Sequence, residues 1–170
     1  MRIGELSPFR VFVSSPVDGI EDFRIAVMKA ARAAENSRKF QFFFYENFEN
    51  ERLDGKTICE SIFVSSGENF DALFVFFRDR VGAGTMEELD YFENAIMQRN
   101  PNCKIWWSQI FCNERSEGTK NLTARLLKYS TGLPILPGDE KIERPSQLAG
   151  RLTAKLWSLV DQMPSQSDAK

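Results

Sequence analysis

The chain has 170 residues, enough for one ordinary domain that buries about 70 % of the surface its unfolded form would expose. Hydrophobic residues make up 42 % of the sequence and charged residues 27 %, a balance that excludes an intrinsically disordered chain. The 24 acidic and 22 basic side chains give a formal net charge of −2, which does not attract nucleic acid or an anionic membrane. We therefore expect one folded domain with no nucleic acid and no membrane among its partners.

The sequence contains no histidine, and this absence limits the chemistry of the chain. Ser-His-Asp triads, Cys-His pairs, His-ligated zinc and histidine general bases are all excluded within it. The cysteines, Cys59, Cys103 and Cys112, are odd in number and form no CxxC pair, which favours reduced thiols. No signal peptide is recognisable, and no run approaches the roughly 18 apolar residues of a membrane helix. We expect a cytoplasmic protein without a bound metal, whose chemistry uses mainly carboxylates.

Apolar runs alternate along the chain with segments whose apolar residues recur every three or four positions, as in alternating strands and helices. In chain order, the expected elements are a strand at 9–14, a helix at 20–35, a strand at 39–45, a charged irregular stretch at 46–56, a helix at 57–66, a strand at 71–78, a helix at 85–98, a strand at 104–107, a helix at 119–129, an edge strand at 133–136 and a closing helix at 145–160. We expect residues 1–8 to be an N-terminal extension, 9–162 to form the single α/β domain and 163–170 to be a disordered tail.

The strands at 9–14 and 71–78 are near-continuous apolar runs, which is typical of parallel strands covered by helices on both faces. We therefore expect an α/β, flavodoxin-like three-layer fold with a central, mainly parallel five-stranded sheet in the order 2-1-3-4-5. The switch point of this order lies between the first and third strands. The loops after Ser14 and after Arg78 should consequently border the same crevice.

A glycine-containing segment, Gly82-Ala83-Gly84-Thr85, follows the third strand and opens the next helix. Open α/β sheets bind ligands at the carboxyl ends of their strands, so Glu88, one turn into this helix, is expected beside a small molecule. The apolar stripe of the helix turns Glu87 toward solvent and leaves Glu88 beside the buried face. The alternative is that Thr85 and Glu88 form a capping box and only satisfy amides at the helix start.

Several short motifs, taken in their order and spacing, match the pattern of a known family. They are Arg10-Val11-Phe12-Val13-Ser14-Ser15, Glu21-Asp22-Phe23-Arg24, Glu46-Asn47-Phe48, Cys59-Glu60, Asp71, Arg80-Val81-Gly82 and Glu88-Leu89-Asp90-Tyr91. Over roughly Phe9 to Trp107 the chain resembles an uncharacterised TIR-like family, which is similar to the wider superfamily of TIR domains and nucleoside deoxyribosyltransferases.

The sequence departs from the family pattern at four positions, Pro16, Tyr45, Val81 and Glu87, which usually hold threonine, methionine, tyrosine and threonine. The likeness to deoxyribosyltransferases is looser and rests on Gly84-Thr85 followed by Glu88. Those enzymes carry an aspartate six positions before the glutamate, where this chain has Gly82.

The resemblance implies cleavage of an N-glycosidic bond with Glu88 as the catalytic residue, and NAD or a related nucleotide as the substrate rather than a cofactor. Nicotinamide leaves NAD as a neutral molecule from a cationic linkage, so one carboxylate that stabilises an oxocarbenium-like ribose suffices. Departure of a base from a neutral nucleoside would need a proton donor, for which Asp79 is the nearest candidate. The family also implies self-association or a larger signalling assembly, in bacterial defence or cell-death signalling.

The residues expected to bind the substrate are Ser14, Ser15, Arg24, Glu46, Arg80, Gly82, Thr85 and Tyr91. The two serines end a strand, where their hydroxyls would hold ribose or phosphate oxygens or would only shape the turn. Arg24 would pair with Glu46 or with a phosphate, and Arg80 would clamp a phosphate, unless each is a solvated arginine.

Gly82 and Thr85 would line the crevice, and Tyr91, one turn beyond Glu88, would shape the pocket or pack in the core. Three functions stay open. The first is a TIR-like NAD glycohydrolase, the second a noncatalytic TIR-like interaction or nucleotide-sensing module of a signalling complex, and the third a nucleoside or nucleotide N-glycosidase or deoxyribosyltransferase.

Overall fold

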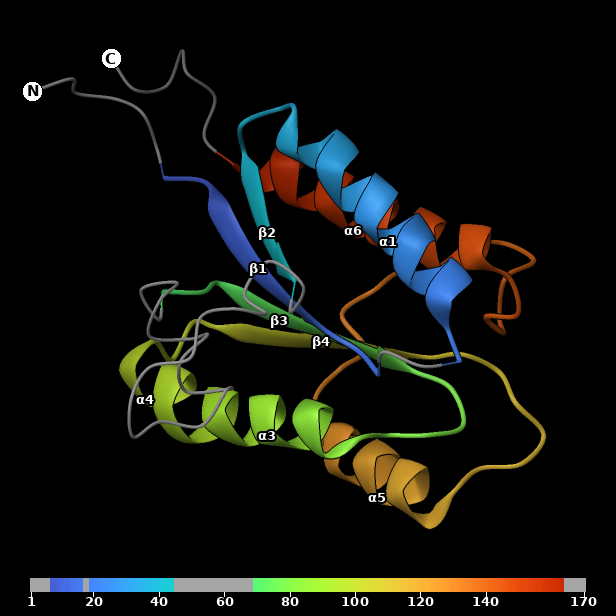
Figure 1. Ribbon diagram of the computed structural model, residues 1–170. Helices are drawn as coiled ribbons and strands as arrows, with labels where there is room; N and C mark the ends of the chain where they lie inside the picture. Colours follow the sequence, from blue (N-terminus) through green and yellow to red (C-terminus); the bar gives the residue numbers. More distant parts are fainter. Residues whose placement is uncertain (1–6, 17–18, 45–68, 164–170) are drawn as a thin grey trace, which may run out of the picture.

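The computed structural model describes residues 7–16, 19–44 and 69–163. Its sheet consists of four parallel strands, β1 (Phe9–Ser14), β2 (Phe40–Phe44), β3 (Ala72–Phe77) and β4 (Lys104–Gln109). They lie in the order β2-β1-β3-β4, so β1 and β3 are the central strands (Figure 1). The expected α/β class, the parallel pairing and the first four places of the strand order are confirmed.

Helices cover both faces of this sheet. Helices α1 (Glu21–Glu35) and α6 (Pro145–Gln162) lie together on one face, and α3 (Ala83–Tyr91) and α5 (Glu117–Leu126) lie on the other (Figure 1). The described chain is therefore three-layered. No helix of the described ranges is long and apolar enough to cross a membrane.

The helix expected at 85–98 differs from the observed one in its start and in its interior. It begins at Ala83, continues from α3 as a π-helical segment, η2 (Phe92–Ile96), and ends as α4 (Met97–Arg99) before Pro101. The expectations for residues 46–56 and 57–66 lie outside the described residues, as do those for most of 1–8 and 163–170.

The expected fifth strand at 133–136 is wrong. The segment contains Pro134, which lacks an amide donor, and it follows Gly132, whose φ of 73° interrupts extended backbone. Two separate contacts lie along the edge of β4 instead. The Trp107 amide donates to the Thr131 carbonyl at 2.9 Å, and Ile142 forms an isolated parallel bridge with Ile110.

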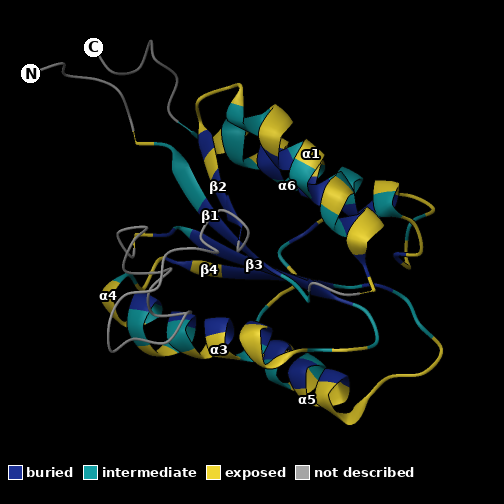
Figure 2. Ribbon diagram, viewed as in Figure 1, coloured by how far each residue is buried: buried dark blue, intermediate teal, exposed yellow. Residues whose placement is uncertain are grey.

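Side chains of the strands alternate between two hydrophobic clusters, one on each face of the sheet. Val11 and Val13 of β1 point toward α1 and α6, whereas Phe12 points toward α3 and α5. Figure 2 shows the strands buried between helices whose outward faces are exposed. Since Ser14 follows Val13, the alternation sends its side chain to the face that α3 covers.

Arg151 of α6 is an exception to this apolar packing. It lies on the buried side of the helix, 8 % exposed, between the buried residues Leu148 and Leu152 of the same helix. Its Nε and Nη2 atoms are buried without a hydrogen-bond partner in the described structure. A buried guanidinium with two unsatisfied donors opposes folding.

Candidate functional site

A serine and a glutamate meet where the carboxyl end of β1 approaches α3. Ser14 is the last residue of β1 and Glu88 lies in the second turn of α3. The Ser14 hydroxyl donates a hydrogen bond to Oε2 of Glu88, and both side chains are buried, with exposed fractions of 1 % and 7 %. The two residues are 74 positions apart in the sequence, so only the assembled sheet and helix bring them together.

The surroundings of Glu88 favour its protonated form. The pKa of Glu88 is raised to about 7, chiefly by burial and to a smaller extent by the negative charge of Glu87, while the Ser14 hydrogen bond acts in the opposite direction. Glu87 itself is exposed, as its place on the helix predicts. Half of the Glu88 carboxyls are therefore ionised near neutral pH.

The capping-box alternative for Thr85 and Glu88 is wrong. The N-cap of α3 is Gly82, which places Thr85 third in the helix rather than at its cap, and no side chain of the described residues caps this helix start. The Glu88 carboxyl is directed to Ser14 on the neighbouring strand instead. Its burial is thus a tertiary feature and does not arise from local helix chemistry.

The bend before α3 does not depend on glycine. Gly82 has φ −84° and ψ 166°, which is extended backbone that any residue adopts. A Cβ atom added at Gly82 or at Gly84 would meet nothing within 4 Å. Space therefore lies open beside both glycines at the start of the helix that carries Glu88.

Ser15 and Arg24 lie on the other side of the end of β1. Successive residues of an extended strand point in opposite directions, so Ser15 is turned toward α1, where its Oγ accepts a hydrogen bond from Arg24 Nε at 3.3 Å. Arg78, after β3, donates from Nη2 to the Gly19 carbonyl at 2.6 Å. This contact places the start of the segment after β3 next to Gly19, which precedes α1, and the crevice expected between the two loops stays a prediction.

The remaining predicted site residues are dispersed. Thr85 is buried on α3, Tyr91 is half-buried against the cluster of Leu89 and Phe92, and Arg80 is exposed on the loop before α3. Glu46 lies outside the described residues. Their binding roles stay predictions, because the structure holds no ligand.

The same holds for Asp79, the expected proton donor for a neutral nucleoside. Its Oδ1 lies 3.5 Å from Nε of Arg78, and the side chain is 43 % exposed. Its role as a proton donor stays a prediction.

Comparison with protein-family models, with curated proteins and with solved structures finds no match for this chain. Within the described ranges, no three His, Cys, Asp or Glu residues form a group suited to a metal ion. The interpretation of the site therefore depends on its own geometry.

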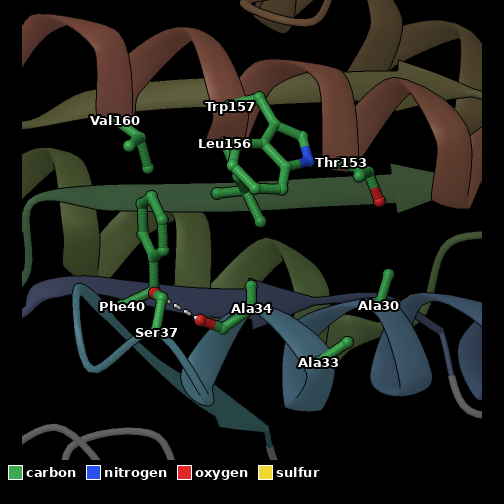
Figure 3. A pocket seen from close by; sticks show the side chains of 9 residues that line it. All are labelled: Ala30, Ala33, Ala34, Ser37, Phe40, Thr153, Leu156, Trp157 and Val160. Atoms are coloured by element: carbon green, nitrogen blue, oxygen red, sulfur yellow. Dashed lines mark hydrogen bonds between the residues drawn. The ribbon is translucent and has the colours of Figure 1, made fainter.

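A groove of about 320 Å³, which the sequence pattern does not predict, lies between α1 and α6. Ala30, Ala33 and Ala34 of α1 face Leu156, Trp157 and Val160 of α6 across it, above Phe40 (Figure 3). Its two hydroxyls donate to nearby carbonyls, that of Ser37 to Ala34 of α1 and that of Thr153 to Ala149 of α6. The groove is apolar and lies on the face of the sheet opposite Glu88, so it is no part of the site around that carboxyl.

The sequence pattern also did not predict that Ser14 and Glu88 contact each other. The signal for it was present in the strand pattern, because Ser14 shares its side of β1 with Phe12 and Glu88 shares its side of α3 with Leu89. Periodicity assigns each residue to a face, but it does not give the register between strand and helix.

Proposed function

We propose that the chain is a TIR-like NAD glycohydrolase in which Glu88 stabilises the ribosyl cation formed as nicotinamide leaves. The observation that supports this proposal is the placement of Glu88, which is buried at the carboxyl end of the central strand β1, next to β3 in the sheet. This is where open α/β sheets bind their ligands. The motifs shared with the TIR-like family supply the substrate class.

The proposed reaction needs one anion. The bond between the ribose carbon and the nicotinamide nitrogen breaks, its electron pair stays on nicotinamide, and the ribose becomes positively charged. The carboxylate of Glu88 offsets that charge in a buried site, where electrostatic stabilisation is strongest. A water molecule then adds to the ribose carbon and releases one proton.

The raised pKa of Glu88 limits this reaction at low pH. Only the ionised form offsets positive charge, and with a pKa of about 7 the ionised fraction falls about tenfold for each pH unit below neutrality. Approach of a cationic substrate favours the ionised form, because an opposite charge lowers the pKa of a carboxyl.

The test is release of base from NAD, NADP and deoxynucleosides by concentrated protein, followed by chromatography. We expect nicotinamide from NAD, and we expect Glu88→Gln to lower its rate of release by about 100-fold or more. The glutamine keeps an oxygen that accepts the Ser14 hydrogen bond, so the fold is retained. Glu87→Gln is the matched control, since it removes an exposed carboxylate one residue away.

A noncatalytic interaction or nucleotide-sensing module is the second candidate. The low exposure of Glu88 and its satisfied bond to Ser14 favour it, because a purely structural carboxyl has the same features. Absence of released base from every substrate, including under conditions that induce self-association, would support this module and contradict the enzyme. Release from deoxynucleosides alone would favour the N-glycosidase or deoxyribosyltransferase.

A further inference from the structure

We propose that Ser14 is a positioning residue that holds one oxygen of Glu88 at the end of β1 and so leaves the other oxygen directed to the substrate. The role of the second oxygen rests on the proposed function. The hydrogen bond by which Ser14 holds the Glu88 carboxyl does not depend on that function. The sequence pattern suggested that Ser14 binds a substrate oxygen directly. The geometry points to a different role.

Ser14 is less accessible to a substrate than Glu88 is, and its donor is already in use. Its side chain is 1 % exposed, and its single donor hydrogen is used in the bond to Oε2 of Glu88. A hydroxyl in this state acts through its partner. In contrast, the Oε1 atom of Glu88 accepts no hydrogen bond from the described residues, so it is the oxygen that stays available.

The backbone around Ser14 is suited to holding a carboxyl in place. Strand β1 pairs with β2 on one side and with β3 on the other, and Ser14 itself is in register with Val75 of β3. A serine on a central, doubly paired strand has little freedom to move. The direction of the Glu88 side chain is thereby tied to the sheet as well as to its own helix.

The hydrogen bond also influences the ionisation of Glu88. Donation from a hydroxyl stabilises the charged form of a carboxyl, whereas burial and the charge of Glu87 oppose it. In the described structure, Glu87 on the same helix is the charged group that acts on Glu88, and the group facing it from β1 is the neutral Ser14. Loss of the hydroxyl therefore leaves two effects that both raise the pKa.

The experiment measures the titration of Glu88 directly, by ¹³C NMR of labelled glutamate carboxyls, with the Glu88 signal assigned from its loss in Glu88→Gln. We expect Ser14→Ala to raise the pKa of Glu88 by about one pH unit, because a hydrogen bond to the charged form is lost. At pH 7 the ionised fraction then falls about fivefold. If the protein hydrolyses NAD, the acid limb of its pH profile moves to higher pH by the same amount.

Two further variants distinguish a positioning role of Ser14 from a nonspecific disturbance of the fold. Ser14→Thr keeps the hydroxyl and is expected to restore the titration. Ser108→Ala also removes a buried strand serine, but it lies on β4, whose alternation places it on the α1 and α6 side with Trp106, and it is expected to leave the pKa of Glu88 unchanged.

The outcomes distinguish this inference from the proposed function. An unchanged titration of Glu88 in folded Ser14→Ala would overturn the role of Ser14, whatever the enzyme assay gives. A shifted titration in a protein that releases no nicotinamide would keep the hold of Ser14 on Glu88 and would contradict only the glycohydrolase. If Ser14→Ala does not fold, a shifted titration in Ser14→Cys, whose thiol is a weaker donor, supports the role, and an unshifted one contradicts it.

Discussion

At the scale of single residues, Glu88 couples the stability of the protein to pH. Its pKa rises from 4.5 to about 7 on folding, so the native state holds a proton that the unfolded state releases between these values. The stabilising contribution is complete below pH 4.5 and is lost as pH rises through 7.

We predict that Glu88→Gln removes this dependence. Relative to the variant, the wild-type free energy of unfolding should fall by about 3 kcal/mol between pH 4.5 and pH 8, from 1.36 kcal/mol per pKa unit. Urea denaturation of both proteins at three pH values measures the difference. Parallel stability curves would show that Glu88 titrates normally in the folded protein.

Arg151 gives a second prediction at this scale. Replacing it with methionine removes two buried donors that lack partners and keeps most of the packing volume. We expect Arg151→Met to raise the free energy of unfolding by about 1–2 kcal/mol, measured by denaturation. Arg115→Met, at an exposed position, is the control and should change stability little. A loss of stability in Arg151→Met would mean that an acceptor occupies the site in solution.

The sequence predicted which face Glu88 takes but not its partner. The stripe of α3 assigns Glu87 to solvent and Glu88 to the buried side, as observed. The contact with Ser14 depends on how far β1 and α3 are displaced along each other. That displacement is a property of tertiary packing, which no local pattern contains.

At the scale of elements, the turn that requires glycine is the one at Gly132, and not the glycine-containing segment at the start of α3 that the sequence pattern suggested. Gly132 has a φ of 73°, and a Cβ added there would lie 2.4 Å from Cδ1 of Trp106. Gly84, within the first turn of α3, has open space instead. The close approach to Trp106 is what requires glycine at position 132.

We therefore predict opposite effects of alanine at these two positions. Gly132→Ala should lower the free energy of unfolding by about 2 kcal/mol or more through strain and overlap. Gly84→Ala should raise it by about 0.5–1 kcal/mol, because alanine is the better helix former. Thermal denaturation of both variants measures these effects. Equal effects at the two positions would contradict the assignment.

Segments with an unbroken apolar pattern and a clear boundary were predicted more accurately than the segment at 133–136. The helix expected at 20–35 is α1, and the strand expected at 9–14 is β1, because each has an unbroken pattern and a clear boundary. The segment at 133–136 is apolar throughout, so its composition resembles a strand, but Pro134 has no amide donor and the backbone does not form a strand.

At the scale of the whole molecule, α6 closes one face of the sheet against α1. Leu148, Leu152 and Leu156 of α6 are buried in one cluster with Val27 and Ala31 of α1. The sequence predicted the three layers, because parallel strands made of continuous apolar runs have to be covered by helices on both faces. The groove beside Phe40 was not predicted. The alanines of α1 leave space there, but this space becomes a groove only because α6 lies opposite, and the sequence pattern does not give the position of α6.

We predict that Leu152→Ala lowers the free energy of unfolding by about 2–5 kcal/mol, because it opens a cavity at a fully buried position. Ser158→Ala, on the exposed side of the same helix, is the control and should have little effect. Urea denaturation compares the two. A small effect of Leu152→Ala would mean that α6 is not packed against α1 in solution.

The pairing of α1 with α6 bears on how the protein is made. The ribosome releases α1 before α6, and the part of its apolar stripe that α6 covers stays uncovered until residues 145–162 have left the exit tunnel. While the residues between the two helices are synthesised, the nascent chain thus exposes an apolar surface to solvent. Chaperones that shield such surfaces should engage this polypeptide until translation reaches its closing helix.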